Sequence, residues 1–76
     1  MRHTMFENVT PAVLERTIDC WVRGRHAERN RCIVKDRLLR GCTFEQLAEA
    51  YGMSVRQVKN IIYRHEAVIC DKMGLS

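Results

Sequence analysis

Two helix-start signals in the second half of the chain restrict the fold more than any other feature. Thr43 and Gln46 form a T-x-x-Q capping box, and Ser54 and Gln57 form a second box, S-x-x-Q. In such a box the hydroxyl caps the new helix while the glutamine reaches back to the cap residue. Gly52, just before the second box, can adopt the positive φ that ends a helix. The stretch therefore predicts two helices joined by a very short turn.

The first half of the chain carries further helix signals. Thr10 followed by Pro11 is an N-cap with proline at the first helical position. Gly24 and Gly41 are suited to end helices in a left-handed conformation, and no strand pattern is present. We therefore expect an all-α fold, a small four-helix domain with a three-helix core and an additional N-terminal helix. The expected helices span residues 10–23, 25–40, 44–51 and 54–69.

The joint between the two capping boxes favours a helix-turn-helix. Helices joined this tightly cross steeply, and the small Ala48 can lie at the crossing, while Leu47, Val58 and Ile61 are spaced to fill the angle. In proteins with this arrangement the second helix enters the major groove of DNA. The expected single domain, 1–76, divides into a flexible arm at 1–9, two supporting helices in 10–40, the helix-turn-helix in 43–66 and a frayed tail at 71–76.

The last expected helix has one apolar and one polar face. At about 100° per residue, the apolar face is expected to consist of Val58, Ile61, Ile62, His65 and Ile69. The opposite arc carries Arg56, Lys59, Asn60 and Tyr63, with Arg64 at its edge. Arginine can bond a guanine edge and asparagine an adenine edge, whereas lysine and tyrosine more often hold phosphate or sugar. A solvated face commonly carries glutamate as well, and this arc has none before Glu66. The arc therefore favours contact with DNA.

Positive charge is concentrated in residues 23–40, which carry seven basic and two acidic side chains, whereas the whole chain has a net charge of +4. Either this segment is a solvated helix face, or it is an electrostatic footprint for phosphate. Three of its arginines cluster on one arc of the expected second helix. Contacts to the DNA backbone are accordingly expected from Thr43, Ser54, Tyr63, Arg64, Arg25, Arg29 and Arg40.

Residues 28–66 resemble the fourth conserved region of bacterial sigma factors. The segments LLRGCTFEQLAEAYGMS and VKNIIYRH follow the pattern of that family, in which a charged helix ends in a glycine before the helix-turn-helix. The resemblance implies a helical domain that reads a promoter element and touches RNA polymerase. It implies base contacts by Arg56, Lys59 and Asn60, and Gln57 is close enough to reach a base or a phosphate. Residues 1–27 are too short for the promoter-opening domain, so we expect a stand-alone sigma-like protein of the kind found on phages and conjugative elements.

The first expected helix has a broad apolar arc of Val13, Leu14, Thr17, Ile18, Cys20 and Trp21. This arc either closes the core alone or also offers a partner surface, for which Leu14, Ile18 and Trp21 are the candidates. Trp21 is the expected anchor in both cases. A homodimer is one use of such a surface, and RNA polymerase is another expected partner.

Other functions are disfavoured by what the sequence lacks. The chain of 76 residues buries only roughly 60% of its unfolded surface, which leaves little room for an enzyme cleft. No carboxylate pair, nucleophile–base set or glycine-rich phosphate loop appears, so we expect no enzyme and no cofactor. Four cysteines without ligand spacing predict free thiols and no metal. No apolar run is long enough for a membrane span or a signal peptide, so we expect a cytoplasmic protein.

Two functions of different kinds remain. One is a sequence-specific DNA-binding protein that regulates transcription. The other is an adaptor that uses a sigma-like fold to bind RNA polymerase or a sigma subunit without reading bases. DNA-binding modules of terminases and transposases carry similar motifs and form a further alternative.

Overall fold

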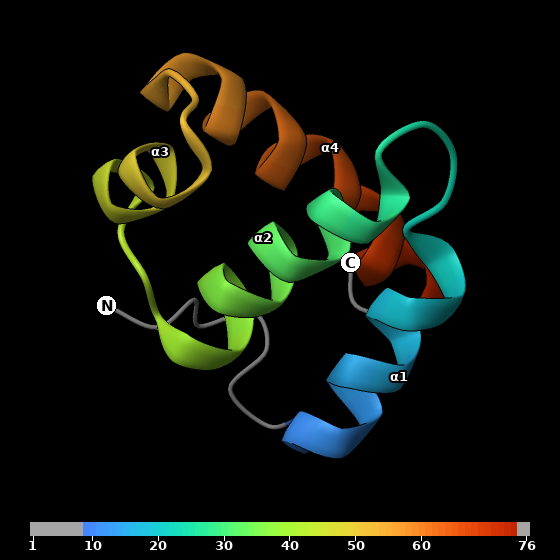
Figure 1. The fold of residues 1–76 in the computed structure, drawn as a ribbon. Coiled ribbons are helices and arrows are strands. Elements are labelled where there is room, and N and C mark those ends of the chain that lie inside the picture. The colour runs from blue at the N-terminus through green and yellow to red at the C-terminus, as the bar shows by residue number, and fades with distance from the viewer. Residues whose placement is uncertain (1–8, 75–76) are drawn as a thin grey trace.

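A computed structural model describes residues 9–74, and within this range the chain forms four α-helices and no strand (Figure 1). α2 lies between α1 and α3, and α4 packs against all three. This arrangement confirms the expected all-α, four-helix domain. The helices are α1 Pro11–Trp21, α2 Ala27–Arg40, α3 Phe44–Tyr51 and α4 Val55–Lys72.

Both capping boxes form as the sequence predicted. Thr43 Oγ1 accepts the Gln46 N–H at 3.0 Å, and Gln46 Oε1 accepts the Thr43 N–H at 2.8 Å. The matching distances for Ser54 and Gln57 are 3.1 and 3.0 Å. Gly52 takes a φ of 64°, and its N–H donates to the carbonyl of Ala48. Local hydrogen bonds at the short turn therefore end α3 at Gly52 and start α4 at Ser54.

The joint between α1 and α2 is longer than expected. α1 ends at Trp21, because Val22 adopts an extended conformation that places its side chain in the core, 1% exposed. The Val22 carbonyl is held by Arg31 Nε at 3.1 Å. Gly24, with a φ of 100°, lies within the joint and is not the end of α1. α2 begins only after His26, which is left-handed at φ 60°. The expected start of this helix at residue 25 was wrong.

The C-terminal end of α4 is more ordered than expected. The frayed tail was placed at residues 71–76, but α4 continues to Lys72. Ile69 and Cys70 are buried and Met73 packs against the core, which fixes the last turn. Residues 75–76 lie outside the described residues. Most of the expected arm at 1–9 also lies outside them, and Val9 is half-buried against the core.

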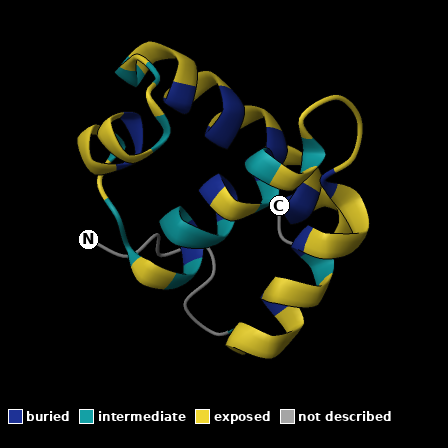
Figure 2. Ribbon diagram, viewed as in Figure 1, coloured by how far each residue is buried: buried dark blue, intermediate teal, exposed yellow. Residues whose placement is uncertain are grey.

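The core is formed by all four helices, and Figure 2 shows the buried side of α4 turned towards α2. Leu47 and Ala48 of α3 and Val58 and Ile61 of α4 are all buried, as expected for residues that fill the angle between these helices. The apolar face expected for α4 is likewise buried. The buried hydrophobic residues are Leu14, Ile18, Val22, Ile33, Val34, Leu38, Leu47, Ala48, Val58, Ile61, Ile62, Ile69 and Cys70.

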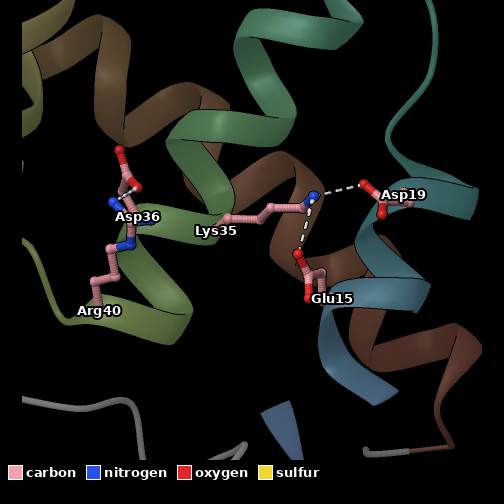
Figure 3. A network of polar contacts seen from close by, with 5 residues as sticks. All are labelled: Glu15, Asp19, Lys35, Asp36 and Arg40. Atoms are coloured by element: carbon pink, nitrogen blue, oxygen red, sulfur yellow. Dashed lines mark ion pairs between the residues drawn. The ribbon is translucent and has the colours of Figure 1, made fainter. Parts of the chain in front are cut away.

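Charged groups on α2 contact the neighbouring helices, and Figure 3 shows the ion pairs of Lys35 with α1 and of Asp36 with Arg40 within α2. Lys35 Nζ contacts carboxylates of α1, at 2.7 Å from Asp19 and 3.6 Å from Glu15. The hydrogen bond to Asp19 raises the pKa of Lys35 above its usual value.

Asp36, also on α2, accepts the Tyr51 hydroxyl at 2.9 Å and pairs with Arg40 at 3.4 Å. Burial, together with this hydrogen bond to Asp36, raises the pKa of Tyr51 to about 12. Asp36 therefore ties the end of α3 to α2.

All four cysteines are unpaired thiols. Burial raises the pKa of Cys70, so its thiol stays protonated at neutral pH. Among residues 9–74, no group of three or more histidine, cysteine or acidic side chains is arranged to hold a metal ion. Within the same residues, none of the helices combines the length and apolarity that crossing a bilayer requires.

Candidate nucleic-acid interface

The outer face of α4 presents basic and amide side chains to solvent. Arg56, Lys59, Asn60, Tyr63 and Arg64 are all exposed. The inner face of the same helix is anchored in the core, so the outer face is held in a fixed position. No carboxylate interrupts this row, because the next acidic residue along the helix is buried. The face is therefore cationic and suited to an anionic partner.

Arg56 and Asn60 lie directly opposite the buried side of α4, one turn apart. Arg64 follows one turn later. Among the described residues, no hydrogen bond or ion pair holds the side chains of these three. Their donors and acceptors are consequently free to meet a ligand.

Lys59 and Tyr63 differ from these three because they contact Phe44, the first residue of α3. The Lys59 ammonium lies 5.5 Å from the centroid of the Phe44 ring, and the Tyr63 ring meets it edge-on at 5.8 Å. Arg37 of α2 also lies over this ring, at 4.2 Å. Sequence reasoning missed Phe44 and Arg37. An aromatic residue directly after an N-cap was the only sequence signal, since the contacts depend on how three helices cross.

The cap residues are partly occupied by their own hydrogen bonds. The Ser54 hydroxyl donates to Gln57 Oε1 at 3.2 Å, and the same oxygen accepts the Ser54 N–H. Gln57 therefore has only its amide nitrogen left for a base or a phosphate. The Thr43 hydroxyl accepts a backbone N–H, and its own proton can still be donated. Of the two caps, Thr43 is the better candidate for a phosphate contact.

Most of the basic side chains in residues 23–40 serve the fold. Arg23, Arg31 and Arg37 donate to the backbone carbonyls of Cys20, Val22 and Cys42. The Cys20 carbonyl belongs to the last turn of α1, and those of Val22 and Cys42 belong to the joints on either side of α2. The arginines therefore help to fix how the chain enters and leaves α2. Much of the positive charge in residues 23–40 is thus engaged in contacts within the domain.

The three arginines expected to touch the DNA backbone are not grouped as predicted. Arg25 lies in the joint before α2 and is exposed. Arg29 is half-buried, with its guanidinium on the Asn30 side-chain oxygen at 3.1 and 3.2 Å. Arg40 is 77% exposed at the other end of α2 and pairs with Asp36. The prediction of one arc on α2 was wrong for Arg25, because α2 starts two residues later than expected.

The proposed partner surface on α1 needs a larger correction. Leu14 and Ile18 are 2% and 0% exposed, respectively, and belong to the core. Trp21 is 45% exposed, and Lys72 of α4 lies 4.3 Å from the centroid of its ring. Val13 is also exposed, at 46%. Of the expected apolar arc, Val13, Cys20 and Trp21 are exposed and available to a partner, whereas Leu14 and Ile18 pack inward.

Comparison of the chain with protein-family models, curated proteins and solved structures gives no match.

Proposed function

We propose that α3 and α4 form a helix-turn-helix that binds double-stranded DNA, with the first half of α4 in the major groove. One observation carries this proposal. Arg56, Asn60 and Arg64 are exposed and have no hydrogen-bond or ion-pair partner among residues 9–74, and the opposite side of their helix is anchored in the core. A helix held in this way can present side chains to base edges at a defined depth.

The side-chain chemistry fits base recognition. The Arg56 guanidinium can donate two hydrogen bonds to a guanine edge, and the Asn60 amide can pair with an adenine edge. Thr43 and Arg64 flank these groups and are suited to phosphate. The acidic side chains of α3, Glu45 and Glu49, are exposed outside this set, so α4 and not α3 faces the DNA.

The resemblance of residues 28–66 to the fourth conserved region of sigma factors extends the proposal to transcription. The protein is then a regulator or sigma-like factor that works in the cytoplasm of a bacterial or phage-infected cell. A single module of this size covers about 600–1,000 Å² of protein surface on DNA. Its own sequence preference is modest, and a second contact, to RNA polymerase or to another copy, multiplies it.

The test is selection of duplexes from a random pool, followed by affinity measurements on the selected site and on a scrambled one. Arg56→Ala and Asn60→Ala should each reduce the difference in binding free energy between the two duplexes by about 1–3 kcal/mol. Arg16→Ala is the matched control, since Arg16 is an exposed cation on α1. The proposal fails if both α4 variants keep the selected-to-scrambled ratio of the wild type.

A second candidate function is an adaptor that binds RNA polymerase or a sigma subunit. The exposed Trp21 favours it, because large aromatic residues are the usual anchors of protein interfaces. Under this alternative, Trp21→Ala abolishes a complex with RNA polymerase, and Arg56→Ala leaves that complex intact. Under the DNA-binding proposal, Trp21→Ala leaves duplex binding unchanged.

A further inference from the structure

Three helices meet at the ring of Phe44. Arg37 from α2 and Lys59 from α4 both lie over this ring, with the Arg37 Cζ at 4.2 Å and the Lys59 Nζ at 5.5 Å from its centroid. Tyr63 closes the cluster with an edge-on contact. Phe44 itself is half-buried, so the cluster lies at the surface, beside the outer face of α4.

The cluster holds two positive charges against the same aromatic ring, although like charges repel each other. An aromatic face attracts cations through its quadrupole, and this attraction offsets part of the repulsion. Arg37 is fixed further by its hydrogen bond to the Cys42 carbonyl at 2.8 Å. The result is a pair of pre-positioned cations at the surface, and an anion bound beside the cluster would offset their remaining repulsion.

From this geometry we infer that Arg37 and Lys59, held by Phe44, form a clamp for a DNA backbone phosphate, and that Lys59 reads no base. Phe44 is then a positioning residue that sets where the backbone runs relative to α4. This inference rests on the proposed DNA-binding function. It reassigns Lys59, which the resemblance to sigma factors had placed among the base readers.

The directions of the side chains support this division. Arg56 and Asn60 stand opposite the core and point straight away from α4. Lys59 lies on the flank of α4, and its side chain extends sideways over α3 to reach Phe44. An ammonium is a compact point charge without the planar fork that reads a base edge, so it suits phosphate in this position. Sequence preference is thus left to Arg56 and Asn60.

The test compares affinities for a selected and a scrambled duplex over a range of salt concentrations. Lys59→Ala should weaken binding to both duplexes by the same factor and make the logarithmic salt slope shallower by about 0.9. Arg56→Ala should instead lower the selected-to-scrambled ratio by about 5- to 150-fold. Phe44→Leu keeps an apolar side chain but removes the ring, and should weaken binding to both duplexes alike. Adding Lys59→Ala to Phe44→Leu should then cost less than in the wild type.

Lys72→Ala is the matched control, because Lys72 makes the same kind of contact with the Trp21 ring at the far end of α4. It should leave the salt slope unchanged. A fall in the selected-to-scrambled ratio for Lys59→Ala overturns the clamp alone, as do fully additive effects of Phe44→Leu and Lys59→Ala. If Phe44→Leu loses helicity, the selected-to-scrambled ratio of Lys59→Ala alone decides whether Lys59 contacts a phosphate or a base. Failure of the wild type to bind any duplex would remove the proposed function and the clamp together.

Discussion

His65 is a buried polar residue in the middle of the helix that we propose to read DNA. It is 7% exposed, and its Nε2 atom has no hydrogen-bond partner among the described residues. Burial lowers the pKa of His65 below its usual value, and the charge of the neighbouring Arg64 lowers it further. The folded protein therefore holds this imidazole in its neutral form near pH 7.

Replacing His65 with leucine should stabilise the fold. A buried polar atom without a partner costs about 1–3 kcal/mol, and leucine removes that atom while keeping a side chain of comparable size. We expect His65→Leu to raise the free energy of unfolding by about 1–2 kcal/mol at neutral pH. For a domain of this length each kcal/mol corresponds to a rise in Tm of about 4–8 °C.

The stabilisation by His65→Leu should grow in acid. In the unfolded chain a histidine binds a proton near pH 6.5, whereas the folded protein resists protonation until a lower pH. As the pH falls below about 6.5, the unfolded state therefore takes up the proton first and the wild type loses stability. The loss is at most about 1.4 kcal/mol per pH unit and stops once the pH is below the folded pKa. The leucine variant lacks this term, although its carboxylates still titrate like those of the wild type.

Urea unfolding followed by circular dichroism between about pH 5 and pH 8 measures both effects. His26→Gln is the control, because His26 is exposed and its replacement should leave the acid-dependent loss in place. The reasoning is refuted if His65→Leu is less stable than the wild type at pH 7, or if the two proteins lose stability in parallel as the pH falls.

Two other predictions concern the joints and the charged contacts between the helices. Gly52→Ala should lower the free energy of unfolding by about 1 kcal/mol, because alanine is strained at a φ of 64° although no atom blocks its Cβ. Thermal melting measures this loss, which should be smaller for Gly52→Asn because asparagine tolerates a positive φ better. Lys35→Met should lower the free energy of unfolding by up to about 1 kcal/mol in low salt, because Asp19 and Glu15 of α1 lose their cationic partner. A difference from the wild type that persists in about 1 M salt would contradict the electrostatic explanation.

The second half of the fold could be predicted closely from the sequence. α3 has the expected bounds, and α4 begins one residue after the expected start, because capping boxes act over three residues and need no tertiary contact. The end of α4 could not be predicted in the same way. Cys70 and Met73 extend the helix by packing against the core, which is a tertiary effect.

The joint between α1 and α2 could not be predicted, because the burial of Val22 in the core, a tertiary effect, decides where α1 ends. The extended Val22 is buried in the core, so α1 ends one residue before it. Gly24 has its positive φ within the joint, where it does not mark a helix end. Charge counting failed in the same region. Arg23 and Arg31 look like a footprint for phosphate in the sequence, yet in the structure they donate to backbone carbonyls.

The candidate site was predicted in part. Helical periodicity identified the exposed arc of α4, since it depends only on the angle per residue and on a buried opposite face. The contacts around Phe44 depend on the crossing of α2, α3 and α4, which periodicity does not give. On α1, the apolar arc was broader than the core needs, and only the structure separates buried Leu14 and Ile18 from exposed Trp21.

The central claim, that DNA meets the outer face of α4, is tested most directly by NMR titration of the isotope-labelled protein with a duplex selected from a random pool. We predict the largest shifts at the backbone amides of Arg56 and Asn60 and at the side-chain amide of Asn60, with smaller shifts near Thr43. The indole N–H of Trp21, on the exposed side of α1, should not move. Shifts centred on Val13 and Trp21, with α4 unchanged at saturating duplex, would contradict the account.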